Sequence, residues 1–156
     1  MSDGPACVDS YFGVQIVGNQ FAGSPDCVRL NDTDSTRLAR VEGNTFNLTA
    51  SGEVLDLSGQ VSSVIVRSSA SNSVVRGNTF GPTVRAVKVE DGSTGNRIEE
   101  NSYVGVTAGA AIDLLPGDGR TPNDPGDADE GGNRLQNFPV ITTAGAESVA
   151  GTLDST

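Results

Sequence analysis

The residues best suited to chemistry lie together in one stretch of the sequence. Residues 117–133, GDGRTPNDPGDADEGGN, combine acids and amides with glycines and prolines, and in 127–133 the acids Asp127 and Asp129 are two positions apart. Calcium takes about six to eight oxygen ligands from carboxylates, amides and carbonyls on tight turns. Because every candidate ligand is an oxygen, calcium is expected rather than zinc. The predicted ligands of this metal site are Asp118, Asn123, Asp124, Asp127, Asp129 and Asn133.

Two other interpretations of this acidic loop stay open. Asp and Asn side chains also cap turns by bonding nearby backbone groups, which would order the loop without a metal. Disorder is the third interpretation, and Pro122 and Pro125 weigh against it because proline restricts the chain. The loop lacks the terminal Glu of an EF-hand, and the acids have no base or aromatic platform beside them. A catalytic role for the loop is therefore not expected.

A second set of charged residues recurs inside four short apolar phrases, CVRL (27–30), VLDL (54–57), AVKV (86–89) and AIDL (111–114). Alternation at period 2 predicts a strand in each phrase, with the charged residue facing water. Stacked strands would align these charges in one row, formed by Arg29, Asp56, Lys88 and Asp113.

This row has two interpretations. It could be the working face of a carbohydrate-active enzyme, a polysaccharide lyase or glycoside hydrolase, or of a carbohydrate-binding module. Glycoside hydrolysis needs two carboxyls about 5–9.5 Å apart, and two coils at about 4.8 Å each would put Asp56 and Asp113 about 9–10 Å apart. Alternatively, opposite charges simply pair across an exposed sheet. We expect the second, and therefore no catalytic residues.

Composition excludes several functions. The net charge of −10 and the pI near 4.2 oppose binding to nucleic acid or to anionic membranes. The chain has no His and no Trp, which excludes imidazole bases and His-containing metal sites. No apolar run is long enough for membrane insertion. Cys7 and Cys27 could form a disulfide in an oxidising compartment or be two unrelated thiols.

A repeat indicates the fold. The phrase "apolar, two residues, Asn, one residue, aromatic" recurs at intervals of roughly 23–36 residues, a period typical of solenoids. Its four clear copies end in Asn19-Gln20-Phe21, Asn44-Thr45-Phe46, Asn78-Thr79-Phe80 and Asn101-Ser102-Tyr103, and a weaker copy ends in Asn137-Phe138. Short strands, Gly/Asn/Ser corners and no helix-period stripe predict an all-β fold, a right-handed parallel β-helix (β-solenoid) of about four coils. Stacking should align the Asn residues in an amide ladder and the aromatic residues in a second, internal ladder.

With its repeats, the segment GAAIDLLPGDGRTPNDPGDADEGGNRLQNFPVITTA (109–144) resembles the last coils of bacterial extracellular right-handed parallel β-helix repeat proteins. The resemblance covers residues 13–144, and residues 109–144 are its specific part. It implies a β-helix domain over residues 1–144, with the acidic loop 117–133 inserted in the last coil. Residues 145–156 resemble the truncated start of a following segment, so the chain is expected to be a fragment of a larger protein.

These observations together predict a non-catalytic extracellular scaffold or adhesion module, stabilised by calcium in the acidic end loop. We expect it to be secreted or on the cell surface of a bacterium, where polysaccharide or a cell surface is the expected partner. Open β-helix ends are exposed sheet edges, so end-to-end self-association is expected as well.

Overall fold

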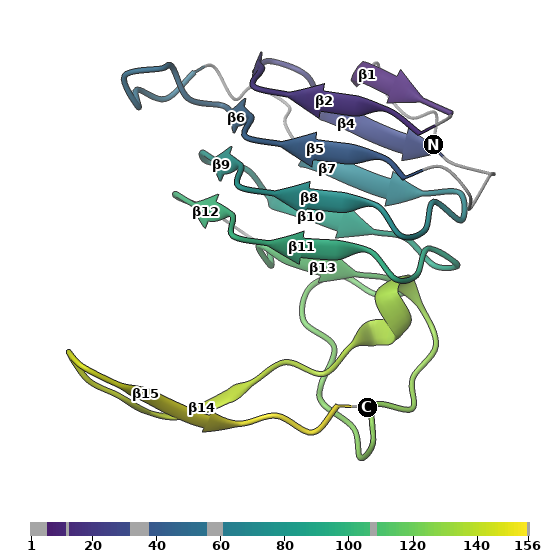
Figure 1. The fold of residues 1–156 in the computed structure, drawn as a ribbon, viewed down its shortest axis with the longest axis vertical. Coiled ribbons are helices and arrows are strands. Elements are labelled where there is room, and N and C mark those ends of the chain that lie inside the picture. The colour runs from purple at the N-terminus through teal and green to yellow at the C-terminus, as the bar shows by residue number, and fades with distance from the viewer. Residues whose placement is uncertain (1–5, 12, 32–37, 56–60, 107–108, 156) are drawn as a thin grey trace.

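The computed structural model describes residues 6–11, 13–31, 38–55, 61–106 and 109–155. The described chain is all-β apart from one short 3-10 turn, and its parallel sheets are stacked in register (Figure 1). The largest sheet contains five parallel strands, in the order β1 (Ala6–Ser10), β4 (Asp26–Asn31), β7 (Ser62–Arg67), β10 (Arg85–Val89) and β13 (Ile112–Leu114).

Two further parallel sheets complete each coil. One contains β2 (Gln15–Val17), β5 (Arg40–Glu42), β8 (Val74–Arg76) and β11 (Arg97–Glu99). The other contains β3 (Gln20–Phe21), β6 (Thr45–Phe46), β9 (Thr79–Phe80) and β12 (Ser102–Tyr103). Each pass of the chain adds one strand to each sheet, so the predicted all-β class is confirmed and the arrangement is compatible with a β-solenoid.

The core lies inside these three sheets and follows from strand alternation. Val28, Val64 and Val87 occupy equivalent positions in β4, β7 and β10, and all three are fully buried. Val41 and Val75 form the matching buried row of the second sheet. Stacking therefore buries β-branched side chains that a single coil could not cover.

The predicted amide ladder is present. The Oδ1 of Asn44 accepts from the backbone N–H of Asn19 at 2.8 Å, and the Oδ1 of Asn78 accepts from that of Asn44 at 2.9 Å. The Oδ1 of Asn101 accepts from the N–H of Asn78, also at 2.9 Å. Each amide nitrogen from Asn44 onward also donates to a carbonyl of the preceding coil. The ladder thus satisfies buried polar backbone at one corner of every coil.

The predicted aromatic ladder is present too. Phe21, Phe46, Phe80 and Tyr103 are stacked, with ring centroids 5.2, 4.9 and 5.5 Å apart. Phe46 and Phe80 are fully buried, whereas Phe21 and Tyr103 at the two ends are partly buried. Burial raises the pKa of Tyr103, since its charged phenolate would lose water.

The residue before each ladder Asn turns the corner in the left-handed region. It is Gly18 (φ 68°), Gly43 (φ 61°) and Gly77 (φ 61°) in the first three coils, but Glu100 (φ 56°) in the fourth. Left-handed backbone is costly for a residue with a Cβ and free of that cost for glycine. The fourth corner is therefore strained where the other three are not.

Replacing Glu100 with glycine should raise the free energy of unfolding by about 0.5–1 kcal/mol. The variant loses the ion pair between Glu100 and Arg76 (2.8 Å), but both side chains are exposed, so that loss is small. Gly77→Ala is the matched control, because its Cβ would meet no atom within 4 Å and only the strain changes. It should lower the stability by a similar amount in urea unfolding. Destabilisation by Glu100→Gly would show that the ion pair outweighs the strain.

The predicted strand VLDL was misplaced. In the described part of that phrase, Val54 forms an isolated antiparallel bridge with Leu48, and Leu55 bonds back to Asn47. The strand that stacks on β4 is β7, residues 62–67, which is richer in β-branched residues. Alternation in VLDL matches that of the stacked strands, but 15 residues (47–61) separate β6 from β7, and the strand that stacks on β4 lies after them.

The register clarifies the cysteine pair. Ala6 and Val8 of β1 lie opposite Asp26 and Val28 of β4, which places Cys7 opposite Cys27 on neighbouring strands. Neighbouring parallel strands are about 4.8 Å apart, within the Cα separation that a disulfide spans. Cys7 is exposed and Cys27 is buried. Their pairing stays a prediction.

The chain closes the last coil after a long excursion. The N–H of Leu115 donates to Val89, and the chain returns at Gly132, whose N–H donates to Leu115. A Cβ on Gly132 would collide with the carbonyl oxygen of Val89, so only glycine allows this approach. The 3-10 turn η1 (Gly132–Leu135) follows, and a hairpin of β14 (Val140–Ala144) and β15 (Val149–Thr152) extends away from the stacked sheets (Figure 1). The expected boundary between residues 144 and 145 falls in the turn of this hairpin.

Candidate functional site

The charged row differs from its prediction in membership and in exposure. The register aligns Arg29, Ile65, Lys88 and Asp113 on β4, β7, β10 and β13. Asp56 lies outside the described residues. Ile65 stands next to Arg29 in the row, at the position predicted for Asp56. The row was expected to face water, but Arg29, Ile65 and Asp113 are buried.

Charge pairing explains this burial. Arg29 bonds Asp26 at 2.7 Å, and Lys88 bonds Glu90 at 3.0 Å. The carboxylate of Asp113 is fully buried. It accepts hydrogen bonds from the Nε of Arg85 at 2.5 Å and from the backbone N–H of Gly119 at 3.0 Å. Counter-charges beside the row, Asp26, Arg85 and Glu90, therefore neutralise its charges. The recurring phrases do not reveal these partners, because the counter-charges Asp26, Arg85 and Glu90 lie outside them.

The spacing of carboxylates along the row does not suit glycoside hydrolysis. The row carries Asp9 at its β1 end and Asp113 at its β13 end. Four strand spacings of about 4.8 Å separate them, which is about 19 Å, whereas hydrolysis needs about 5–9.5 Å. Within the described row, no two carboxylates occupy neighbouring strands.

The acidic loop is ordered by hydrogen bonds to its own chain. Asn123 makes a reciprocal pair with the backbone of Phe138, at 2.8 and 3.0 Å. Asp124 accepts from the N–H of Ala128 at 3.1 Å, and Asp127 accepts from the N–H of Asn137 at 2.6 Å. The bond from Ala128 to Asp124 is the local cap that the self-capped interpretation predicts. The bonds to Asn137 and Phe138 instead tie the loop to the chain that follows it.

The remaining predicted ligands point to different partners. Asp118, which is 85% exposed, pairs with Arg85 at 2.5 Å. Asn133 accepts from the N–H of Asn96 at 3.0 Å, and Asn96 accepts from the N–H of Ser73 at 2.9 Å, so Asn133 ends a second amide ladder. Asp129 makes no hydrogen bond or ion pair with the described residues. Among those residues, no group of three or more acidic or cysteine side chains lies close enough together to hold one metal ion. Calcium binding by the six predicted ligands stays a prediction.

Asp129 offers a clean test of the calcium prediction. If the loop binds calcium, millimolar calcium should raise the midpoint of thermal unfolding by several degrees relative to a chelator, and Asp129→Asn should reduce that rise. Asp91→Asn, which removes an acid on a turn outside the loop, is the matched control. Magnesium at the same concentration controls for ionic strength. An unchanged midpoint would assign the loop to the self-capped interpretation.

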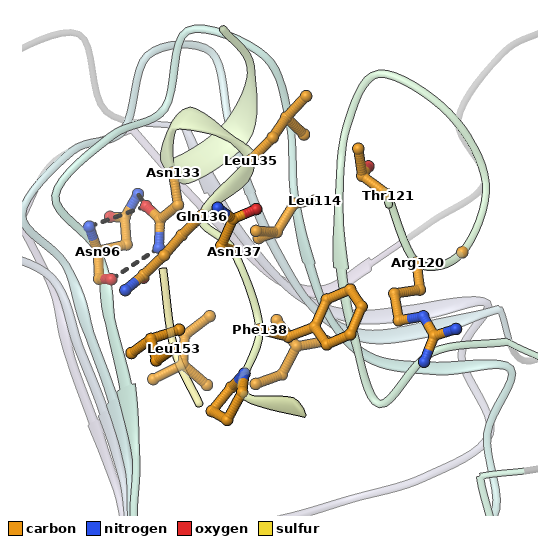
Figure 2. Close-up of a pocket in the computed structure, with 14 residues that line it drawn as sticks. Asn96, Leu114, Arg120, Thr121, Asn133, Leu135, Gln136, Asn137, Phe138 and Leu153 are labelled. Carbon is orange, nitrogen blue, oxygen red and sulfur yellow. Dashed lines mark hydrogen bonds between the residues drawn. The ribbon is translucent and has the colours of Figure 1, made fainter. Parts of the chain in front are cut away.

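A cavity of about 360 Å³ lies between the last coil and the returning chain (Figure 2). The coil contributes Ile98, Ile112 and Leu114, and the returning chain contributes Leu135, Phe138 and Leu153. The guanidinium of Arg120 lies 4.5 Å from the centre of the Phe138 ring. This cavity has no signal in the sequence, because its walls come from separate segments that only the fold brings together.

Comparisons with protein-family models, with curated proteins and with solved structures found no match to this chain. In the described part of the chain, no helix has the length and apolar character needed to cross a membrane.

Proposed function

We propose that the chain is a non-catalytic scaffold, a stiff spacer within a larger bacterial protein that is secreted or displayed on the cell surface. In this proposal the stacked sheets are a right-handed parallel β-helix, since connections between parallel strands are right-handed in about 98% of cases. The proposal draws on the resemblance of residues 109–144 to the closing coils of such proteins. A polysaccharide or a cell surface is the proposed partner.

One observation carries this proposal. Amide and aromatic ladders run without a break through all four coils, so that each coil is bonded to the next by side chains as well as by strands. Polar networks of this kind hold a single arrangement when every member is satisfied. Such a stack transmits load along its axis, which is what a spacer requires.

Native-state hydrogen exchange tests the spacer. The backbone N–H groups of Asn44 and Asn78 lie in different coils and both donate to ladder amides. In a stiff rod they should exchange only by cooperative opening, with protection that approaches the global free energy of unfolding. Coils that exchange independently, with low protection, would contradict the proposal.

A polysaccharide panel separates the scaffold from the carbohydrate-active alternative. The scaffold releases no reducing or unsaturated ends from any polymer. Release that survives purification and is lost in Lys88→Ala would assign catalysis to the charged row instead.

The first coil, where β1, β2 and β3 are edge strands, is the surface proposed for end-to-end self-association. Sedimentation at several concentrations would detect it.

A further inference from the structure

The cavity at the end of the stack has the size and lining of a small-molecule site. Its volume of about 360 Å³ lies within the range of ligand pockets, about 300–1,000 Å³. Aliphatic side chains line it from both sides, and Phe138 lies near its centre (Figure 2). An apolar body is therefore the part of a ligand that this cavity would bury.

The walls of the cavity are fixed before any ligand arrives. Asn137 is buried, and its amide nitrogen donates to the carbonyls of Asp124 (2.7 Å) and Asp154 (2.5 Å). Asn123 holds the backbone of Phe138 through two hydrogen bonds. Asn96 and Asn133 are bonded to each other in the second ladder, as the dashed lines of Figure 2 show. These amides are engaged in the structure itself, which leaves them little capacity to bind a ligand.

Among the described residues that line the cavity, Arg120 alone carries a positive charge. Its guanidinium lies over the Phe138 ring, and among the described residues no carboxylate pairs with it. The nearby acids are already engaged, because Asp118 pairs with Arg85 and Asp124 caps the N–H of Ala128. In a chain with a net charge of −10, an arginine without an acidic partner at the edge of an apolar cavity is suited to bind an anion.

From this geometry we propose that the cavity binds a small amphipathic carboxylate, with its apolar chain against Leu114, Leu135 and Leu153 and its carboxylate on Arg120. The site lies at the end of the stack rather than on the charged row, so this inference is independent of the scaffold function. An aliphatic alcohol of the same length would fill the same space without the charge-assisted bond.

Calorimetric titration with octanoate and 1-octanol tests the site. Octanoate should bind, and 1-octanol should bind roughly tenfold more weakly, as expected for the loss of one charge-assisted bond. Arg120→Gln should weaken octanoate binding roughly tenfold and leave 1-octanol binding unchanged. Arg134→Gln is the matched control, since it removes the same charge from an exposed arginine that does not line this cavity, and it should leave both affinities unchanged.

Leu153→Ser provides a second variant that keeps the charge. Leu153 lines the cavity but is 54% exposed, so the fold should tolerate the change. Both ligands should bind this variant more weakly, because apolar wall is lost. The proposal is overturned if octanoate does not bind at millimolar concentration, if 1-octanol binds equally well, or if Arg120→Gln and Arg134→Gln have the same effect.

Discussion

Replacing Asn78 with alanine should lower the free energy of unfolding by about 3–4 kcal/mol. Its Oδ1 accepts from the backbone and side-chain nitrogens of Asn44, at 2.9 and 3.0 Å. Its Nδ2 donates to the carbonyl of Val41 at 2.8 Å and to Asn101 at 3.0 Å. Alanine would leave the N–H of Asn44 and the carbonyl of Val41 buried without partners, and each unsatisfied group costs about 1–3 kcal/mol.

Asn19→Ala is the matched control, because Asn19 occupies the same position at the exposed first rung of the ladder. Its side chain only donates, to Asn44 at 3.3 Å and to the carbonyl of Val17 at 3.1 Å, and water can replace both bonds. We expect Asn19→Ala to lower the free energy of unfolding by less than about 1 kcal/mol. Urea unfolding measures this, provided that the variant and the parent chain have the same dependence of that free energy on urea concentration. Equal losses in the two variants would show that the ladder contributes no more inside the stack than at its end.

The ladders were predictable from sequence because each rung is encoded within one short phrase. Asn and an aromatic residue two positions later recur in every coil, and stacking alone then aligns them. The second ladder has no such signal in the sequence, because its rungs, Asn96 and Asn133, have no aromatic residue two positions later, and Asn133 is the last residue of the acidic loop. A recurring phrase shows which residues of successive coils will stack on one another, whereas an isolated Asn does not.

The charged row shows where local pattern fails. Alternation indicates which residues share a face of a strand, but it does not indicate which strand stacks on which. The alternation in VLDL therefore predicts a strand next to β4, at the position that β7 occupies. Alternation also predicts exposure for a central charge, which holds only if no counter-charge covers it. Arg85 covers Asp113 from the neighbouring strand, and that contact depends on the three-dimensional register.

The acidic loop shows a different limit. Its composition is equally suited to calcium and to self-capping, because carboxylates and amides accept bonds from cations and from N–H groups alike. What distinguishes the two is whether the oxygens converge, and this depends on turns set by Gly131 (φ 150°) and Asp127 (φ 54°). Composition can therefore identify the loop as a candidate without deciding its ligands.

Replacing Asp113 with alanine should lower the free energy of unfolding by about 3–5 kcal/mol, the range for breaking a buried ion pair from one side. The carboxylate has no exposed surface, and its partner Arg85 is only 16% exposed. The variant would leave the guanidinium with the exposed Asp118 alone and would leave the N–H of Gly119 without its acceptor. Lys88→Ala is the control from the same row, since its pair with Glu90 is partly exposed and should contribute less than about 1 kcal/mol.

A double-mutant cycle isolates the ion pair from the rest of the effect. Arg85→Leu alone should be as costly as Asp113→Ala, because it leaves a buried carboxylate without its cation. The double variant Arg85→Leu/Asp113→Ala should recover part of the loss, since no charge is then left unpaired. If Asp113→Ala proved neutral to stability, the buried pair of Arg85 and Asp113 would contribute nothing to the folded state, and this expectation would be wrong.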